Sequence, residues 1–330
     1  MKAVQFAKFG VPHKVARCVE VDDVGAPGVG EVVIEIEAFP INPADLLTIQ
    51  GRYAVRPKLP ALLGAEGVGR ITAAGKKVKG VKTGDRVINL GRDNWVQKCR
   101  VKHEQVIKVP GNSDVLQLAM LKVNPATAFL LLRNYVQLKA GDWVIQNAAN
   151  SGVGANLIRL AKAKGIRTAN VVRREELIEP LKAIGADVVV VAGKGMTDRV
   201  LEQTGNAGIR LAVDAVAGEA SMELASCLGD GGTVVNYGLL SGKPCMITAH
   251  QTVFRGISLT GFWLAKFLTT TPRKEIEAVY AELLDLVRSG RLRVEVEATY
   301  GIEDIQEALD HAAREGRSGK ILVTPNGPVS

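Results

Sequence analysis

The sequence predicts an α/β protein that combines a β-rich, barrel-like domain with a doubly wound parallel sheet. Three observations support this fold class: a length of 330 residues, short alternating strand patterns over the first 110 residues, and apolar strands alternating with amphipathic helices after them. A chain of this length exceeds what one core usually organises, since about 150 residues per domain is a common size. We therefore expect two domains.

The first domain is expected over residues 1–116, where segments of alternating polarity are separated by glycine-rich turns. Examples are GEVVIEIEAFPINP, GVGRITAAGKKV and GDRVINL. Turn signals at this spacing are typical of β-sandwiches and barrels. Short strand patterns return near the end of the chain, in RVEVEATY and KILVTP. We therefore expect residues 267–330 to complete the first domain, which makes that domain discontinuous.

The second domain is expected over residues 117–266, because the pattern changes near Asn124. Near-continuous apolar strands with helical crossovers are typical of a parallel sheet that is covered on both faces. A further helix is expected at PRKEIEAVYAELLDLVRSG, which has a proline near its start and a glycine at its end. The expected strands are DWVIQNA, TANVV, DVVVV, LAVDAV, GTVVNYG and SLTGFW, and helical segments between them include GANLIRLAKAKG, LIEPLKAIGA and EASMELASCLG.

Composition restricts the class of function. Apolar residues make up 47% of the chain, but no run of about 18 apolar residues could span a bilayer, so no membrane partner is expected. The segment MKAVQFAKFG has the features of neither a signal peptide nor a transit peptide, and we expect a cytoplasmic protein. The formal charge of +8 favours anionic ligands. No basic block with interleaved aromatic residues indicates a nucleic acid partner.

A strand, a turn of small residues and a helix follow one another in VIQNAANSGVGANLIRLAKAKG. This is the context that a dinucleotide-binding turn requires. Gly154 would let the helix pack closely on the strand, and Gly152 would let the backbone approach a pyrophosphate at the helix N-terminus. Asn150 and Ser151 stand where a plain fingerprint has glycines, and their side chains can bind phosphate. An ordinary strand-to-helix turn is the alternative interpretation.

Two arginines end the next strand of this domain, in NVVRRE. An NAD-selective site tends to place Asp or Glu here, about twenty residues after the turn, to bind the ribose hydroxyls. Arg173 and Arg174 can instead pair with the additional phosphate of NADPH. The expected cofactor is therefore NADPH, with two solvated arginines at a strand end as the alternative.

These segments resemble the medium-chain dehydrogenase/reductase superfamily over essentially the whole chain, and within it the zinc-independent 2-enoyl thioester reductases, the trans-2-enoyl-CoA reductase group. The resemblance implies a GroES-like barrel domain around a Rossmann domain. It also implies NADPH-dependent reduction of the α,β double bond of an enoyl-CoA or enoyl-ACP. The motifs are INPADLLTIQGRY at 41–53, VNPATAF at 123–129, VIQNAANSGVG at 144–154, NVVRRE at 170–175 and LTGFWLAKF at 259–267.

The resemblance implies that Tyr53 is the catalytic donor. When hydride adds to the β carbon, negative charge builds on the thioester carbonyl oxygen, and a hydrogen-bond donor at that oxygen stabilises the enolate. A phenol is protonated at neutral pH and suits this role. Whether Tyr53 also protonates carbon stays open, and a surface tyrosine is the alternative. Asp45 is expected to orient the loop of Tyr53 rather than to titrate in catalysis.

The resemblance also implies a set of cofactor contacts. Phe262 and Trp263 are expected to line the substrate pocket as well, although Trp263 could instead be a core aromatic at the domain junction. The implied cofactor-binding positions are Asn124, Asn150, Ser151, Gly152, Val153, Arg173, Arg174, Tyr237, Gly238, Leu239, Leu240, Phe262, Trp263, Leu264 and Lys320.

No metal is expected. Zinc-dependent members of the superfamily bind a catalytic metal through Cys, His and a second Cys or Asp, whereas the corresponding segments here are INPAD and GAEGVG. Pro43, Ala44 and Ala65 offer no thiolate or imidazole, and a zinc site needs three or four such ligands. The four cysteines and four histidines have no spacing typical of a metal site or a redox pair.

Two other functions stay open at this point. An NADPH-dependent quinone or small-enone oxidoreductase shares the fold and the cofactor, and a non-catalytic NADPH-binding protein would keep the turn without the chemistry. The expected partners are an enoyl thioester or enone, with an acyl carrier protein as one carrier of the substrate. We also expect a homodimer joined through the edge strand SLTGFW.

Overall fold

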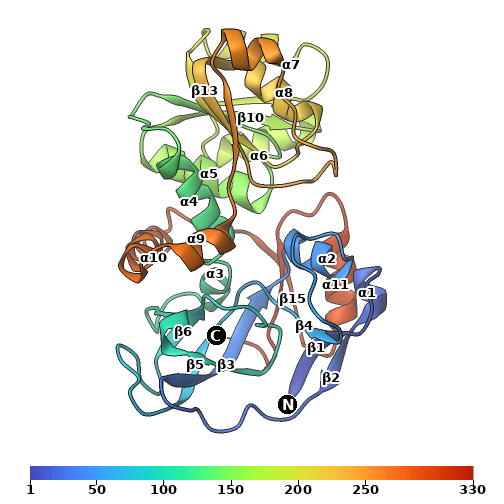
Figure 1. Ribbon diagram of the computed structural model, residues 1–330, viewed down its shortest axis with the longest axis vertical. Coiled ribbons are helices and arrows are strands. Elements are labelled where there is room, and N and C mark those ends of the chain that lie inside the picture. Colours follow the sequence, from blue (N-terminus) through green and yellow to red (C-terminus); the bar gives the residue numbers. More distant parts are fainter. Residues whose placement is uncertain (330) are drawn as a thin grey trace. The chain divides into compact units, whose positions relative to one another are not determined.

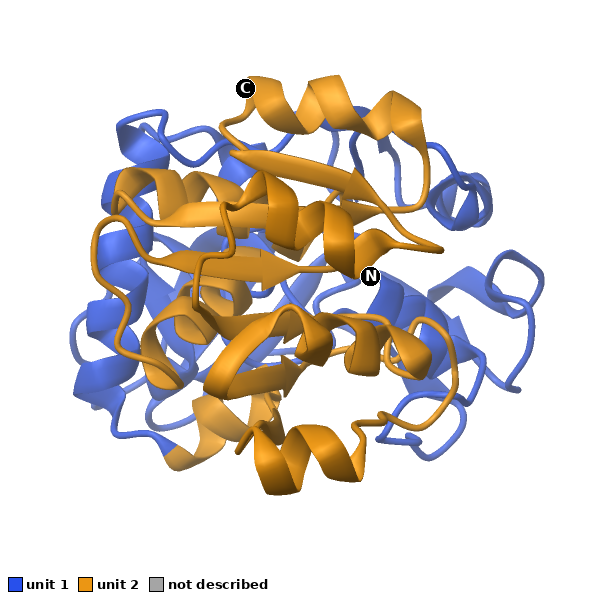
Figure 2. Cartoon of the chain, turned by 90° about the horizontal axis from the view of Figure 1, so that it is seen from above, with its two compact units in different colours: residues 1–123, 271–330 blue, residues 124–270 orange. Residues whose placement is uncertain are grey.

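The computed structural model describes residues 1–329 and divides the chain into two compact units, drawn in different colours in Figure 2. Unit 1 comprises residues 1–123 together with the chain from Thr271 onward, and unit 2 comprises residues 124–270. The boundaries predicted from the sequence lie at residues 116–117 and 266–267. Each unit is described by itself below.

Unit 1 is built around two sheets in the described part of the chain. The smaller has the strand order β2-β1-β4, and the larger has the order β15-β16-β3-β5-β6-β8 with β7 also paired to β3. The strands are β1 Lys2–Phe6, β2 Ala16–Glu20, β3 Glu31–Pro40, β4 Ala61–Leu62, β5 Val68–Ala74, β6 Arg86–Asn89, β7 Lys98–Lys102, β8 Val106–Lys108, β15 Val296–Tyr300 and β16 Lys320–Val323.

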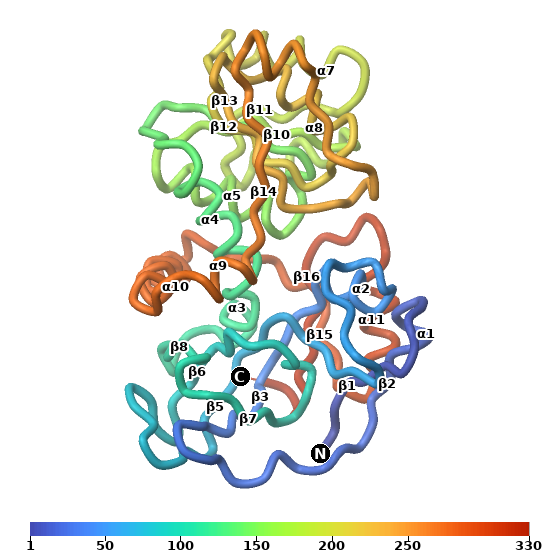
Figure 3. The backbone as a smooth tube through the Cα atoms, viewed as in Figure 1, coloured from blue at the N-terminus to red at the C-terminus, as the bar shows by residue number. Residues whose placement is uncertain are grey.

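Strand β3 connects the two stretches of unit 1. It pairs antiparallel with β5 and β7 from the first stretch and with β16 from the second, where Leu322 lies opposite Pro40. Figure 3 shows this pairing as the red end of the chain beside a blue strand. Phe39 at the end of β3 stacks on the fully buried Trp95, with ring centroids 5.6 Å apart. The late strands therefore complete a sheet that the first residues begin.

The helices of unit 1 have apolar faces that match their burial. In α10 the buried residues include Ile276, Val279, Tyr280 and Leu283, and this spacing of three to four residues forms one stripe. Helix α2 begins at a proline, which suits the first helical position because it needs no N–H there. The helices are α1 Pro12–Val15, α2 Pro43–Ile49, η1 His103–Gln105, α3 Val115–Ala119, α10 Arg273–Arg288 and α11 Ile305–Ala313.

Unit 2, all of whose residues are described, contains a six-stranded parallel sheet of order β11-β10-β9-β12-β13-β14. In order of appearance this is 3-2-1-4-5-6, the arrangement of doubly wound dinucleotide-binding folds. The predicted fold class is confirmed. The strands are β9 Trp143–Gln146, β10 Arg167–Val172, β11 Val188–Val191, β12 Ile209–Asp214, β13 Leu228–Asn236 and β14 Ser258–Gly261.

Helices lie on both sides of this sheet (Figure 2), which explains why its strands are apolar throughout. Val171 packs in one core cluster and its neighbour Val172 in another, because successive side chains point to opposite faces. Helix α7 was not among the helices expected from the sequence. The helices are α4 Asn124–Asn134, α5 Gly152–Ala163, η2 Glu175–Leu177, α6 Ile178–Ala183, α7 Met196–Gln203, α8 Glu219–Ser226, η3 His250–Phe254 and α9 Leu264–Thr270.

Across residues 1–329, none of these helices has the length and apolar character needed to cross a membrane.

Candidate active site

The turn between β9 and α5 is the first part of the candidate site, and α5 is labelled in Figure 1. β9 ends at Gln146 and α5 begins at Gly152, so residues 147–151 lie at the carboxyl edge of the sheet. The hydroxyl of Ser151 accepts a hydrogen bond from the backbone N–H of Gly154 over 3.1 Å and caps the helix. Because a helix N-terminus carries partial positive charge, the turn is suited to a phosphate.

Close contacts require both glycines of this turn. A Cβ atom at Gly154 would lie 2.5 Å from the carbonyl oxygen of Ala149, and one at Gly152 would lie 2.8 Å from Nδ2 of Asn124. Asn124 is the buried first residue of α4. The structure therefore brings Asn124 against the turn, although the two are distant in sequence.

The end of β13 lies beside the same turn. The backbone N–H of Tyr237 donates to the carbonyl of Asp214 over 2.9 Å, and a Cβ atom at Gly238 would lie 2.5 Å from the carbonyl oxygen of Ala215. Burial raises the pKa of Tyr237, and the neighbouring side chain of Ser151 opposes that rise. Among residues 1–329, the buried hydroxyl of Tyr237 has no hydrogen-bond partner.

Asp214, which the sequence analysis did not single out, holds these strand ends together. It is the last residue of β12 and is fully buried. Its carboxylate accepts hydrogen bonds from Asn147 Nδ2 at 2.6 Å, Ser221 Oγ at 2.6 Å and Asn236 Nδ2 at 2.9 Å, and from two backbone N–H groups. Burial raises the pKa of this carboxyl, but the hydrogen bonds outweigh it and leave the pKa below its usual value.

One sequence signal could have revealed this network. A polar residue stands at or directly after the end of each of the neighbouring strands β9, β12 and β13, namely Asn147, Asp214 and Asn236. Carboxyl ends of parallel strands meet at one edge of the sheet, which is where ligands of such folds bind. The three residues are therefore expected to meet.

The two arginines lie directly after β10, where the sequence analysis expected them. Arg173 is exposed, and Nε of Arg174 lies 2.8 Å from a carboxylate oxygen of Glu176. The side chain of Arg174 is 36% exposed. Glu176 is a competing anion for one of them.

The remaining predicted contacts of unit 2 differ in exposure. The backbone N–H of Phe262 donates to the carbonyl of Asn236 over 2.8 Å, which places the segment after β14 beside the end of β13. The side chain of Trp263 is 42% exposed. Of the other positions, Val153 is buried, Leu264 is half-buried, and Asn150, Leu239 and Leu240 are exposed.

Tyr53 lies in unit 1, on the loop that follows α2. Asp45 in the first turn of α2 is buried, and its carboxylate accepts the backbone N–H groups of Asn42 at 2.9 Å and Ala65 at 3.1 Å. Burial raises the pKa of Asp45 to about 6. Asp45 therefore fixes the start of the helix that leads to Tyr53, which itself is half-buried.

The loop of Tyr53 is anchored to the N-terminal segment. Gly51 has a φ of +71°, and the ring of Phe9 lies only 3.1 Å from where its Cβ would be. Arg56 donates from Nε to the carbonyl of Gly51 over 2.9 Å, and its guanidinium lies 5.7 Å from the centre of the Phe9 ring. These contacts define the position of the loop on both sides of Tyr53.

Lys320, the last predicted cofactor contact, begins β16 and is buried. Its ammonium donates to Oδ1 of Asn42 over 2.6 Å, and Nδ2 of Asn42 donates to Glu66 Oε1 over 2.7 Å. The other oxygen of Glu66 accepts the backbone N–H of Val123 at 2.8 Å. Sequence reasoning missed Asn42 and Glu66, because a single Asn or Glu in a short motif has no distinguishing pattern.

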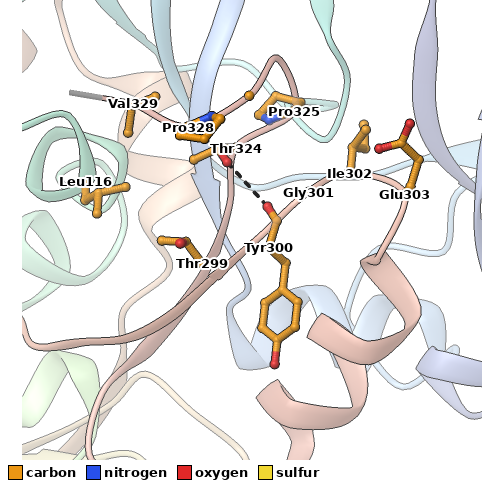
Figure 4. A pocket seen from close by; sticks show the side chains of 11 residues that line it. Leu116, Thr299, Tyr300, Gly301, Ile302, Glu303, Thr324, Pro325, Pro328 and Val329 are labelled. Atoms are coloured by element: carbon orange, nitrogen blue, oxygen red, sulfur yellow. Dashed lines mark hydrogen bonds between the residues drawn. The ribbon is translucent and has the colours of Figure 1, made fainter.

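One cavity of unit 1 lies away from these groups. It has a volume of about 320 Å³ and is lined by residues around Tyr300, Glu303 and the segment from Thr324 to Val329 (Figure 4). None of the predicted site residues lines it. The candidate site is therefore defined by the groups above and not by this cavity.

Two protein families match the chain. The model described as alcohol dehydrogenase GroES-like domain matches residues 28–128, and the one described as zinc-binding dehydrogenase matches residues 152–289. The chain is 35% identical over 337 residues to the mitochondrial enoyl-[acyl-carrier-protein] reductase of Rattus norvegicus. The aligned region covers 98% of this chain and 88% of the rat protein.

Two solved structures are similar over the whole chain. The complex of the 2-enoyl thioester reductase Etr1p with NADP and crotonyl-CoA superimposes with a TM-score of 0.84 and 25% identity, covering 98% of this chain and 99% of that one. A quinone oxidoreductase of Pseudomonas syringae pv. tomato superimposes with a TM-score of 0.88 and 26% identity over the same shares.

The donor groups of this chain do not fit the zinc that one family description names. Pro43, Ala44 and Ala65 stand in the two motifs concerned, and the nearby carboxylates of Asp45 and Glu66 are bound to backbone N–H groups and Asn42. Among residues 1–329, no three His, Cys, Asp or Glu side chains lie close enough to hold a metal ion.

Proposed function

The chain belongs to the 2-enoyl thioester reductase group of the medium-chain dehydrogenase/reductase superfamily, and we propose that it reduces the α,β double bond of 2-enoyl thioesters with NADPH. The observation that carries this proposal is the full-length similarity to an enoyl-[acyl-carrier-protein] reductase, 35% identical over 98% of the chain. The chain also has Tyr53 at the end of its INPADLLTIQGRY motif. The substrate class is an enoyl-CoA or enoyl-ACP.

The cofactor proposed is NADPH, which supplies a hydride to the β carbon when bound. The capped N-terminus of α5 at Ser151 would bind its pyrophosphate, since backbone N–H groups and the helix dipole both favour an anion there. Arg173 and Arg174 would bind its 2′-phosphate. Asp214 would hold the three strand ends around this turn in place.

Tyr53 is proposed as the donor to the thioester carbonyl oxygen. Negative charge develops on that oxygen as the β carbon accepts hydride, and a donor already in place there is worth several kcal/mol in a dry site, on the order of 3 kcal/mol. The phenol stabilises the enolate or passes its proton to the α carbon. Phe262 and Trp263 are proposed to line the acyl pocket.

A quinone or small-enone oxidoreductase is the second candidate. The quinone oxidoreductase of P. syringae superimposes with a TM-score of 0.88, higher than the 0.84 of the Etr1p complex. The overall fold does not determine the substrate. Which compound accepts hydride from NADPH is therefore decided by measuring turnover with each candidate. A non-catalytic NADPH-binding protein is the third candidate, and turnover with any acceptor excludes it.

The test is cofactor oxidation by the purified protein with crotonyl-CoA, a quinone and a free enone in parallel, each with NADPH and NADH. We expect NADPH to be consumed with the thioester and butyryl-CoA to be formed, and we expect slower consumption with NADH. Consumption with the quinone and none with crotonyl-CoA would overturn the proposal in favour of the second candidate.

We also propose that the chain forms a homodimer and accepts acyl carrier protein as a substrate carrier. β14 is the edge strand of its sheet and is mostly exposed, so it can pair with a second copy. A monomeric mass in light scattering at micromolar concentration would contradict the dimer. The cytoplasmic location stays a prediction, since the rat relative is a mitochondrial protein.

A further inference from the structure

The loop that contains Tyr53 carries three exposed cations and no carboxylate. Arg52, Arg56 and Lys58 are exposed, and residues 46–65 include no Asp or Glu. Within residues 1–329, no carboxylate forms an ion pair with any of these three side chains. The positive charge beside Tyr53 is therefore not compensated by the described part of the chain, and an anion is the kind of ligand that this loop attracts.

Arginines of the large sheet in the same unit do have a carboxylate partner. Nε of Arg86 lies 2.7 Å and Nε of Arg70 lies 3.1 Å from oxygens of Glu37. Exposed cations without such a partner also occur in the turn between β5 and β6, at Lys76 and Lys79. That turn contains none of the predicted site residues, so it offers a natural control for the loop of Tyr53.

The cations of the loop are held in place before any ligand binds. Arg56 donates from Nε to the carbonyl of Gly51 over 2.9 Å, and its guanidinium lies 5.7 Å from the centre of the Phe9 ring. Its terminal nitrogens donate to no acceptor among residues 1–329. The backbone N–H of Arg52 donates to a carbonyl of α2 over 2.9 Å. A guanidinium that is already positioned loses little further freedom when it binds an anion.

The spacing between Tyr53 and these cations matches the length of a thioester's carrier arm. Arg52 is the neighbour of Tyr53, and five extended residues span at most about 18 Å, which limits the distance from Tyr53 to Lys58. The pantetheine arm between the sulfur and the first phosphate of coenzyme A is about as long as four to five extended residues, roughly 15 Å. A thioester carbonyl at Tyr53 therefore leaves the phosphates within reach of the loop.

We propose that Arg52, Arg56 and Lys58 bind the phosphates of coenzyme A when the substrate is an enoyl-CoA. Guanidinium groups pair with phosphate through two parallel hydrogen bonds, and three cations suit a carrier that has several phosphates. An acyl carrier protein offers a single phosphate on the same arm. All three residues belong to unit 1. The inference rests on the proposed function for the thioester at Tyr53, and it identifies coenzyme A as the carrier that this loop recognises.

The experiment is a calorimetric titration of the protein, saturated with NADP⁺, with butyryl-CoA and with butyryl-pantetheine, which lacks phosphates. Saturation keeps the nucleotide part of coenzyme A from binding at the turn before α5. Wild type should bind butyryl-CoA at least about tenfold more tightly than butyryl-pantetheine. Only the affinity for butyryl-CoA should fall when salt is raised from about 0.05 M to about 0.5 M, because salt screens exposed charges.

Arg52→Gln and Lys58→Gln should each weaken butyryl-CoA binding about threefold or more, and the double variant about tenfold or more. Neither change should weaken the binding of butyryl-pantetheine. Arg56 is left in place, because it also anchors the loop. The matched control combines Lys76→Gln with Lys79→Gln, which removes the same charge from exposed positions of the same unit. It should keep both wild-type affinities.

Equal wild-type affinity for the two ligands, or an equal loss of butyryl-CoA binding in the control, would overturn the inference. It would also be overturned by variants that bind butyryl-CoA normally but bind butyryl-acyl carrier protein more weakly, since the cations would then recognise the protein carrier. The titration needs no turnover. A protein that binds butyryl-CoA through these cations yet reduces no enoyl thioester would refute the proposed function and leave this inference standing.

Discussion

The carboxylate of Asp214 accepts a hydrogen bond from Nδ2 of Asn147 at 2.6 Å, joining the ends of two neighbouring parallel strands, β12 and β9. Asn147 Oδ1 in turn accepts the backbone N–H of Ala215 at 2.7 Å. The link is reciprocal and buried, so it defines the spacing of the strand ends from which the phosphate turn starts.

Replacing Asp214 by Asn should weaken NADPH binding. The variant keeps the shape of the side chain, but an amide NH₂ replaces one of the two carboxylate oxygens and cannot accept a hydrogen bond. Some of the five donors that now contact the carboxylate would lose their acceptor, at a cost of about 1–3 kcal/mol each. We expect the dissociation constant of NADPH to rise at least about tenfold, together with a lower melting temperature. Fluorescence titration and thermal unfolding measure the two effects. Wild-type affinity in a destabilised variant would show that Asp214 is purely structural.

Replacing Arg173 and Arg174 by Ser should reduce the preference for NADPH. A charge-assisted contact to phosphate is worth about 1.5–3 kcal/mol, so KM for NADPH should rise by about tenfold or more per arginine. KM for NADH, which lacks the additional phosphate, should change little. Steady-state kinetics with both cofactors is the check. An equal rise in both KM values would contradict the assignment of the 2′-phosphate site.

Gly154→Ala should destabilise unit 2, because the new methyl group would meet the carbonyl oxygen of Ala149 at 2.5 Å. Backbone has to move to relieve such a contact, at a cost of about 1–3 kcal/mol in the free energy of unfolding. Gly208→Ala is the control in the same unit, since no atom lies within 4 Å of its added Cβ. Urea unfolding compares the two variants, and equal midpoints would contradict the predicted close packing.

Glu297→Gln should remove part of the acid sensitivity of unit 1. One carboxylate oxygen of Glu297 lies 2.8 Å from His311 Nε2, and the other accepts the backbone N–H groups of Ser318 at 2.6 Å and Gly319 at 2.9 Å. Burial raises the pKa of this carboxyl, but these hydrogen bonds outweigh it and lower the pKa from 4.5 to about 2.

A carboxyl whose pKa is lower in the folded state stabilises the fold above its unfolded pKa and loses that contribution as the pH falls towards the folded value. The wild type should therefore be more stable than Glu297→Gln at neutral pH. The difference in unfolding free energy should shrink as the pH falls from 4.5 towards 2. Urea melts at several pH values measure it, and a constant difference would assign the effect to packing alone.

The sequence predicted best what is local in the chain. The turn requires only a strand end, small residues and a helix start within a few positions, and the close packing at Gly154 follows from that order. The helix-capping role of Ser151 was not among the predictions. The parallel sheet was likewise predictable, because strands covered on both faces are apolar throughout.

The polar networks could not be predicted in the same way, because their members are distant in sequence. Asn147 and Asp214 are 67 positions apart, and Asn42 and Lys320 are 278 positions apart. Asn, Asp and Glu in short motifs serve as caps, as surface groups and as buried partners, and only the fold decides among these. His311 illustrates the same limit, since it has no motif yet contacts both Tyr300 and Glu297.

Tyr53 is proposed to donate a hydrogen bond to the carbonyl oxygen of an enoyl thioester during reduction by NADPH. The most direct measurement is kcat/KM for crotonyl-CoA with NADPH, compared between wild type and Tyr53→Phe, with the dissociation constant of NADPH measured for both. We expect Tyr53→Phe to lose kcat/KM by a factor on the order of a hundred or more, with unchanged NADPH affinity. Equal kcat/KM in the two proteins would contradict it.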